Sequence, residues 1–177
     1  MSTTVRAMTA ADLPAVHAVE AVAGERFRSV TDPRIAGCAD DPPFGAAELR
    51  DYIDAGHAWV ATEDDEVVGF VVIDLLDDCA HIEEVAVAPD AGRRGYGRAL
   101  VETVVTWAGR HGCAAVTLTT FRDVAWNGPW YQRLGFRDIA ESDLTDGLRA
   151  RRESEAAEGL APELRTVMRR EVPSRSG

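Results

Sequence analysis

The chain has 177 residues, of which 46% are hydrophobic and 28% charged, and its net charge is −11. This length suits one domain with a full core, so we expect a single domain over residues 1–177. The negative charge argues against nucleic acid as a partner, and the absence of a long apolar run argues against a membrane span.

The cysteines and the N-terminal segment predict the compartment. Cys38, Cys79 and Cys113 are an odd number without C-x-x-C spacing, which argues against a disulfide framework and a zinc site. The first residues show no basic segment followed by an apolar core, so no secretory signal is predicted. We therefore expect a cytoplasmic protein without a bound metal.

The first half of the chain predicts two helices and then a run of strands. Apolar residues recur at helical spacing after Thr9, which can cap a helix, and β-rich segments follow with short acidic turns between them. Such turns favour antiparallel hairpins. The proline-rich segment 25–45 is expected to be an irregular loop. The predicted elements are a strand at 3–7, helices at 9–24 and 46–55, and strands at 57–62, 66–75 and 79–88.

The second half begins with a strand, a helix and another strand. A crossover of this kind joins parallel strands, so a βαβ unit is predicted over residues 79–120. A charged helix and a last strand close the chain, and residues 172–177 are expected to be a disordered tail. The predicted elements are helices at 94–110, 126–134 and 143–158, and strands at 114–120, from Phe136, and at 164–172.

The most informative stretch is Ala80–Leu100, in which an apolar strand runs into the loop GRRGYG at Gly92–Gly97. Gly95 and Gly97 let the backbone approach a ligand closely, and the N-terminus of the following helix favours negative charge. Arginines at three positions add positive charge: Arg93, Arg94 and Arg98. No Lys-Ser/Thr follows and no third glycine is present, which excludes a nucleotide P-loop and the dinucleotide fingerprint. The loop therefore predicts a phosphate site of another kind.

At this loop the sequence resembles the GNAT superfamily of acyl-CoA-dependent N-acetyltransferases. The family pattern is Gln/Arg-x-x-Gly-x-Gly/Ala after a strand that ends in a small apolar residue, Val and Pro, and here A-V-A-P precedes G-R-R-G-Y-G. Gly92 departs from the pattern, and we expect Arg93 or Arg94 to supply the missing charge. A second family signature appears as WYQRLGF, at Trp130–Phe136. The order of elements matches the family from residue 3 to about 140 and less clearly over 141–177.

The resemblance implies an α/β (α+β) GNAT fold, a mixed central sheet of about six to seven strands flanked by helices, with a βαβ acetyl-CoA-binding core. The ligand is then acetyl-CoA or a close relative. Backbone amides of the loop would hold its pyrophosphate, and the strand before the loop would pair with its pantetheine arm. Asn127 would contact the cofactor, unless it only caps its helix. The implied cofactor-binding residues are Val85, Ala86, Val87, Arg93, Arg94, Gly95, Tyr96, Gly97, Arg98 and Asn127.

The strand before the loop carries the candidate bases. Alternation places His81, Glu83 and Val85 on one face and Glu84 on the other. His81 and Glu83 stand where the serotonin N-acetyltransferase branch carries paired histidines, and His81 stands where histone-type members carry a catalytic Glu. We expect Glu83 as general base with His81 coupled to it, and Glu84 in reserve as a more structural residue. Two alternatives stay open: Glu83 is only a surface carboxylate, and His81 is an ordinary strand residue.

The remaining steps of the reaction are also implied by the resemblance. The Val85 backbone N–H would stabilise the oxyanion, and Tyr131 would protonate the CoA sulfur. The alternative for Tyr131 is a core aromatic. Cys79 and Cys113 show no sign of activation, so we expect direct transfer in a ternary complex rather than an acyl-enzyme.

The expected function is N-acetyltransfer from acetyl-CoA to a primary amine, which we expect to be a small molecule. The acceptor would lie between loop 25–45, the active face and the region after Phe121, unless the polar and aromatic side chains there serve only solubility and packing. An arylalkylamine or polyamine is favoured weakly. A protein or peptide acetyltransferase and a non-catalytic acyl-CoA sensor are the alternatives, and a homodimer is left open. The acceptor-binding candidates are Glu25, Asp40, Asp41, Asp123, Trp126 and Trp130.

Overall fold

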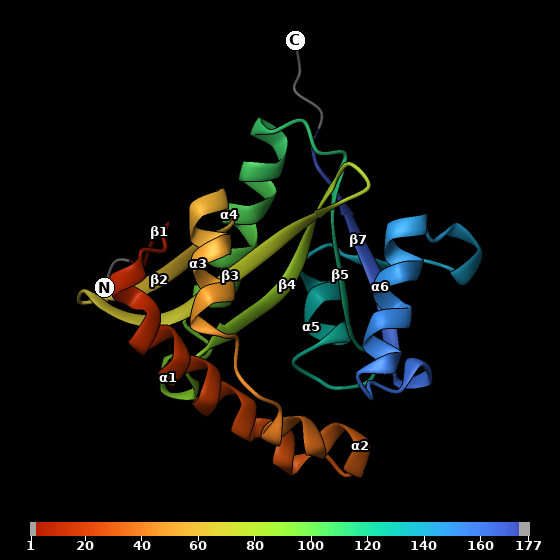
Figure 1. Cartoon of the computed structure of the whole chain (residues 1–177), viewed down its shortest axis with the longest axis horizontal. Coiled ribbons are helices and arrows are strands. Elements are labelled where there is room, and N and C mark those ends of the chain that lie inside the picture. The colour runs from red at the N-terminus through yellow and green to blue at the C-terminus, as the bar shows by residue number, and fades with distance from the viewer. Residues whose placement is uncertain (1–2, 174–177) are drawn as a thin grey trace. The chain divides into compact units, whose positions relative to one another are not determined.

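The computed structural model describes residues 3–173, which form a mixed α/β fold (Figure 1). The strands are β1 (Thr4–Ala7), β2 (Ala58–Glu63), β3 (Glu66–Leu76), β4 (Cys79–Val87), β5 (Ala115–Phe121), β6 (Arg137–Asp138) and β7 (Arg165–Glu171). The α-helices are α1 (Leu13–Gly24), α2 (Pro33–Ala36), α3 (Ala46–Ala55), α4 (Tyr96–Arg110), α5 (Gly128–Arg133) and α6 (Asp146–Ala157). Short 3₁₀ helices lie at Ala10–Asp12, Glu25–Ser29, Gly37–Asp40, Pro89–Ala91, Glu141–Asp143 and Pro162–Leu164.

Among residues 3–173, hydrogen bonding joins seven strands in the order β1-β2-β3-β4-β5-β7-β6, which confirms the predicted mixed sheet. The chain divides into two compact units. The first joins the chain up to Asp74 with Glu83–Thr103, and the second joins Leu75–Ile82 with the chain from Val104 on. Strand β4 and helix α4 therefore each contribute to both units. That the two units make one domain stays a prediction.

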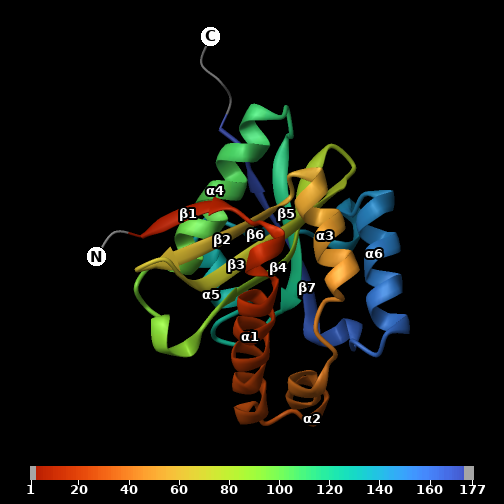
Figure 2. The ribbon, with the colours of Figure 1, turned by 60° about the vertical axis from the view of Figure 1, so that its left-hand side comes forward.

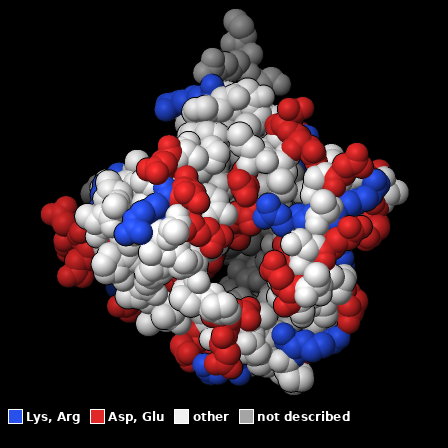
Figure 3. Space-filling view, in the orientation of Figure 1, with Lys and Arg blue, Asp and Glu red and all other residues white. Residues whose placement is uncertain are grey.

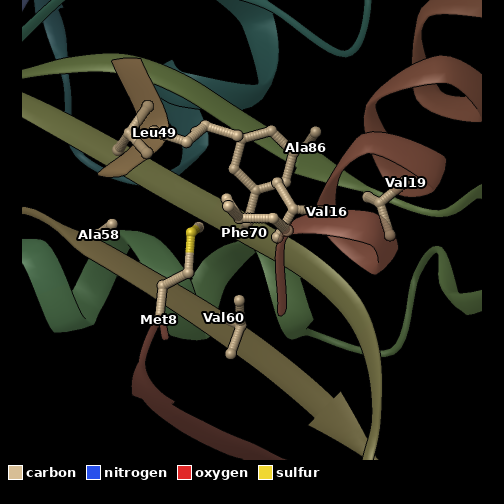
Figure 4. Packing of buried hydrophobic residues seen from close by; sticks show 10 residues of the cluster. Met8, Val16, Val19, Leu49, Ala58, Val60, Phe70 and Ala86 are labelled. Atoms are coloured by element: carbon tan, nitrogen blue, oxygen red, sulfur yellow. The ribbon is translucent and has the colours of Figure 1, made fainter. Parts of the chain in front are cut away.

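The core of the first unit lies between its strands and two helices. Strands β1, β2 and β3 pair antiparallel, as the short acidic turns predicted, and α1 and α3 lie on one face of them (Figure 2). Figure 4 shows the buried Phe70 of β3 among Val16 of α1, Leu49 of α3 and Ala86 of β4. Because side chains alternate along a strand, Glu84 shares the face of Ala86.

A buried carboxylate fixes the start of the first helix. Asp12 accepts hydrogen bonds from the Thr9 N–H and from both terminal nitrogens of Arg6, each at 2.8 Å. The Arg6 guanidinium contributes most to lowering the pKa of Asp12, to about 2, since it stabilises the ionised form. The predicted helix thus starts after Thr9, first as a 3₁₀ turn and then as α1.

The expectation of an irregular loop at 25–45 is wrong. This segment contains the two short 3₁₀ helices Glu25–Ser29 and Gly37–Asp40 with α2 between them. Asp32 caps α2 by accepting a hydrogen bond from the Arg34 N–H at 2.9 Å, and Pro33 stands at the first helical position. Helices this short are set by caps and turns and carry no long apolar period that a sequence pattern would reveal.

The second unit is built around β5. The N-terminal part of β4 pairs parallel with β5 over three residue pairs, from Ala80↔Val116 to Ile82↔Leu118, which confirms the predicted βαβ unit. Strand β7 pairs antiparallel with β5 and also with the short β6. Leu148 of α6 packs with Val167 of β7 in a small separate cluster. Residues 174–177 of the predicted tail lie outside the described part of the chain.

No helix within residues 3–173 is both long and apolar enough to cross a membrane.

Candidate active site

The phosphate loop, which we define as Gly92–Gly97, leaves β4 through a 3₁₀ turn and opens α4. Gly95 has a φ of +87°, which L-residues rarely adopt, and open space surrounds the position that a Cβ would take. The Gly95 carbonyl accepts the Ala99 N–H at 2.9 Å and so starts the helix. N–H groups in the first turn of an α-helix have no partner within it, so this loop presents donors suited to an anion.

Two of the three arginines at the loop carry uncompensated charge. Arg94 donates from Nη1 to both carboxylate oxygens of Glu63 at 2.8 Å, so its charge is balanced. Arg93 and Arg98 are exposed and make no ion pair with residues 3–173. Acidic side chains (red) are spread widely over the face of the molecule in Figure 3. Of the two residues expected to replace the missing family charge, Arg93 is therefore the better placed.

The loop also explains why Gly92 departs from the family pattern without breaking the fold. Gly92 has a φ of −61°, which any residue can adopt, whereas Arg93 has a φ of +64°. The left-handed conformation that favours glycine thus falls on an arginine, one residue after the glycine.

We expect the Arg93→Gly variant to raise the free energy of unfolding by roughly 0.5–1 kcal/mol, since it removes left-handed strain. Gly95→Ala is the matched opposite and should lower it by about 1 kcal/mol, because alanine is strained at the Gly95 conformation. Urea unfolding of both variants measures these changes. A loss of stability in Arg93→Gly would show that the arginine conformation is supported by its surroundings.

Glu84 on β4 is the most perturbed acid of the first unit. Glu84 as a whole residue is half-buried on the face of Ala86, and its carboxyl group makes no hydrogen bond or ion pair with residues 3–173. Burial, and secondarily the nearby charge of Glu20, raise the pKa of Glu84 to about 8. The group therefore changes charge close to neutral pH.

Glu20 on α1 is a second carboxyl group with an unusual environment. Its Oε1 accepts the Phe44 N–H at 3.0 Å, and its Oε2 is buried without a hydrogen-bond partner among residues 3–173. Burial raises the pKa of Glu20 as well. No sequence pattern pointed to this residue, because its contact with Phe44 spans 24 positions of the chain.

His81 lies in the second unit and is fully buried. Its Nδ1 lies 2.9 Å from the Thr117 hydroxyl, and burial, followed by the charges of Arg151 and Arg165, lowers its pKa to about 3. The imidazole is thus neutral at pH 7 and a weak proton acceptor. Glu83 is half-buried in the first unit, and its coupling to His81 stays a prediction.

Two further predicted residues lie at α5. Tyr131 is buried, and its ring makes edge contacts with Trp130 at 4.8 Å and Phe136 at 5.6 Å between centroids. Asn127 stands at the N-cap of α5, the position that the helix-cap alternative predicted, although its side chain makes no capping hydrogen bond with residues 3–173. Its role as a cofactor contact stays a prediction.

The negative charge of two acidic residues in the 25–45 segment is balanced by an arginine. Arg28 pairs with Glu25 and with Asp40, each at 2.7 Å, and lowers the pKa of both carboxyl groups. These two candidates for acceptor binding are therefore not free anions. No group of three or more His, Cys, Asp or Glu among residues 3–173 is arranged to hold a metal ion.

A protein-family model described as the acetyltransferase (GNAT) family matches residues 26–136. The chain belongs to the acetyltransferase (GNAT) family. It is therefore an acyltransferase, and the matched range contains both the phosphate loop and the WYQRLGF signature.

Solved structures agree with this family fold. The PaiA N-acetyltransferase from Thermoplasma acidophilum in complex with coenzyme A has a TM-score of 0.72 at 15% identity, over 97% of this chain and 99% of that one. The ribosomal-protein-S18-alanine N-acetyltransferase from Escherichia coli has a TM-score of 0.65 at 20% identity, over 99% and 97%. N-acetylglutamate synthase from Neisseria gonorrhoeae, complexed with coenzyme A and N-acetyl-glutamate, has a TM-score of 0.73 at 18% identity, over 98% and 36%.

For this GNAT-family acyltransferase, the sequence pattern located the loop but missed its support. Glu63 was not singled out, although it holds Arg94. The available signal was weak: Glu63 precedes the acidic pair Asp64-Asp65, which marked only a hairpin turn. The partner of Glu63 lies 31 positions further along the chain and follows from the fold alone.

Proposed function

We propose that this protein transfers an acetyl group from acetyl-CoA to the primary amine of a small molecule, by direct transfer. The observation that carries the proposal is the phosphate loop at the N-terminus of α4, with uncompensated charge on Arg93 and Arg98. A CoA pyrophosphate matches the donors and the charge that this loop offers. The coenzyme A in the similar structures supports the same ligand class.

The pantetheine arm is proposed to follow the backbone of Val85, Ala86 and Val87. The parallel ladder between β4 and β5 joins only residues up to Ile82 and Leu118, although β4 continues to Val87. The backbone groups of Val85–Val87 on that edge of β4 are therefore outside this ladder. Asn127 is proposed as a further cofactor contact.

Glu84 is our first choice for the general base. An alkylammonium acceptor has a pKa of about 10 and must lose a proton before its nitrogen can attack. A base is most effective when its pKa lies near the working pH, and the pKa of about 8 at Glu84 meets that condition. Glu83 is the alternative, whereas the pKa of about 3 at His81 argues against His81 as the proton acceptor.

The proposed reaction uses three groups of this chain. Glu84 takes a proton from the ammonium, and the free amine forms a C–N bond with the thioester carbonyl carbon. The Val85 N–H donates to the oxygen on which negative charge develops. As the C–S bond breaks, Tyr131 donates its hydroxyl proton to the sulfur, and the second nitrogen proton passes to the Tyr131 oxygen, so that a neutral amide and a thiol are released and the tyrosine is restored.

The acceptor is proposed to be small because the end of the 25–45 segment is held in place. The backbone of Phe44 is bound at both ends, its N–H by Glu20 at 3.0 Å and its carbonyl by the His17 Nε2 at 2.9 Å. We propose that this segment covers the acceptor, where a segment held in place leaves more room for a small ligand than for a peptide chain. An arylalkylamine or polyamine is the acceptor class to test first.

The test is thiol release from acetyl-CoA in the presence of a panel of small amines and of peptides with free N-termini or lysines. We expect amine-dependent release with at least one small amine. Release with peptides alone would replace the small-molecule acceptor by a protein acceptor. CoA binding without turnover on any acceptor would show a sensor instead of an enzyme.

A further inference from the structure

The β2–β3 hairpin ends in a turn that directs one side chain toward the phosphate loop. Glu63 and Glu66 face each other across the two-residue turn Asp64-Asp65, in which φ is +49° and +68°. Before this turn the register between β2 and β3 shifts after Ala61. Such irregularities bend a strand and re-aim the side chains that follow, here Glu63.

Glu63 acts on both neighbours of the glycine at the centre of the loop. The Arg94 Nη1 donates to both carboxylate oxygens at 2.8 Å, and burial, and secondarily the Glu63 carboxylate, raise the pKa of the Tyr96 hydroxyl. The Glu63 side chain is only 17% exposed, and Tyr96 is buried. Between them lies Gly95, whose conformational freedom would otherwise leave the loop loosely defined.

We propose that Glu63 is a positioning residue for the phosphate loop, which it holds in the conformation that binds the CoA pyrophosphate. This inference rests on the proposed function. The charge of Glu63 alone would weaken binding, because a carboxylate beside a phosphate site repels the negatively charged ligand. The gain comes from fixing residues 94–96 before the ligand arrives, which lowers the entropy lost on binding.

The experiment compares Glu63→Ala with Glu66→Ala in the full chain. Both variants remove one negative charge from the same hairpin, and both side chains line a hollow of about 370 Å³ beside the loop. Glu66 is exposed and its side chain makes no hydrogen bond or ion pair with residues 3–173, so it is a matched control for charge. Titration calorimetry with acetyl-CoA gives the dissociation constant, and steady-state kinetics gives KM and kcat.

Positioning predicts that Glu63→Ala raises Kd and KM for acetyl-CoA by about tenfold with little change in kcat, and that Glu66→Ala leaves them unchanged. With S-acetylpantetheine, which lacks the pyrophosphate, Glu63→Ala should keep the wild-type kcat/KM. Tyr96→Phe, which retains the buried ring, should give a smaller loss in the same direction and remains informative if Glu63→Ala folds poorly.

Other outcomes separate this inference from the proposed function. If wild type binds acetyl-CoA and both alanine variants bind it equally or more tightly, Glu63 acts only through its charge and the inference is wrong. An equal loss with S-acetylpantetheine would also overturn it, since the defect would then reach beyond the phosphate loop. A wild-type protein that does not bind acetyl-CoA would contradict the proposed function itself.

Discussion

Glu84→Gln is expected to lower kcat by about 100- to 1,000-fold at pH 8, the usual effect of removing a general base. Glutamine keeps the size of the side chain and cannot take a proton from the acceptor ammonium. The wild-type kcat should rise with pH through the Glu84 pKa of about 8. In the variant this rise of kcat with pH should be absent. Steady-state rates from pH 6 to 10 with saturating acetyl-CoA measure both effects.

Two variants serve as controls for this result. Glu83→Gln changes the adjacent carboxyl group on the opposite face of β4 and should keep most of kcat. Glu20→Gln removes the neighbouring charge that raises the pKa of Glu84, so the rise of kcat with pH should move to lower pH. A large loss in Glu83→Gln with a normal Glu84→Gln would assign the base to Glu83.

The same group sets a pH dependence of stability. In the unfolded chain Glu84 ionises near its ordinary value of 4.5, whereas in the folded protein it ionises near 8. The folded state therefore binds more protons between these values, and wild-type stability falls as the pH rises through this window. Glu84→Gln should remove that part of the decrease. Urea unfolding at pH 5 and pH 9 separates this effect from catalysis.

Phe70→Ala is expected to lower the free energy of unfolding by about 3–5 kcal/mol, the usual cost of truncating a fully buried phenylalanine. Phe70 is 0% exposed and lies at the centre of the first unit's core, so its removal leaves a cavity between β3 and the helices α1 and α3. Urea denaturation at pH 7 measures the change.

Val22→Ala is the control for this core variant, because Val22 is 47% exposed on α1 and should change stability by less than about 0.5 kcal/mol. A loss below about 1 kcal/mol in Phe70→Ala would show that the core collapses around the vacant space and is not as closely packed as described.

The sequence predicted most regular elements because each is marked along the chain itself. β-rich segments between short acidic turns located β2, β3 and β4, and the order of strand, helix and strand over residues 79–120 located α4. The 25–45 segment was mispredicted because its short helices depend on the cap at Asp32 and on the ion pairs of Arg28. Such local contacts leave no apolar period in the sequence.

Of the candidate site, the sequence predicted only the part that is contiguous in the chain. The phosphate loop is contiguous, so its glycines and arginines were readable from the sequence. The environment of a carboxyl group depends on residues distant in the chain, and the ranking of Glu83 above Glu84 rested on alternation and resemblance alone. The Glu20 side chain on α1 and the desolvation of Glu84 become visible only in the folded unit.

The most direct test of the account is a single-turnover reaction with acetyl-CoA labelled in the acetyl group and an amine that supports thiol release. The account predicts that the label passes to the amine in one step, and that the protein alone, incubated with labelled acetyl-CoA, acquires none. Label retained on the protein, at Cys79 or Cys113 for example, would contradict direct transfer. Label recovered as free acetate, with none on the amine, would contradict acetyl transfer to an amine.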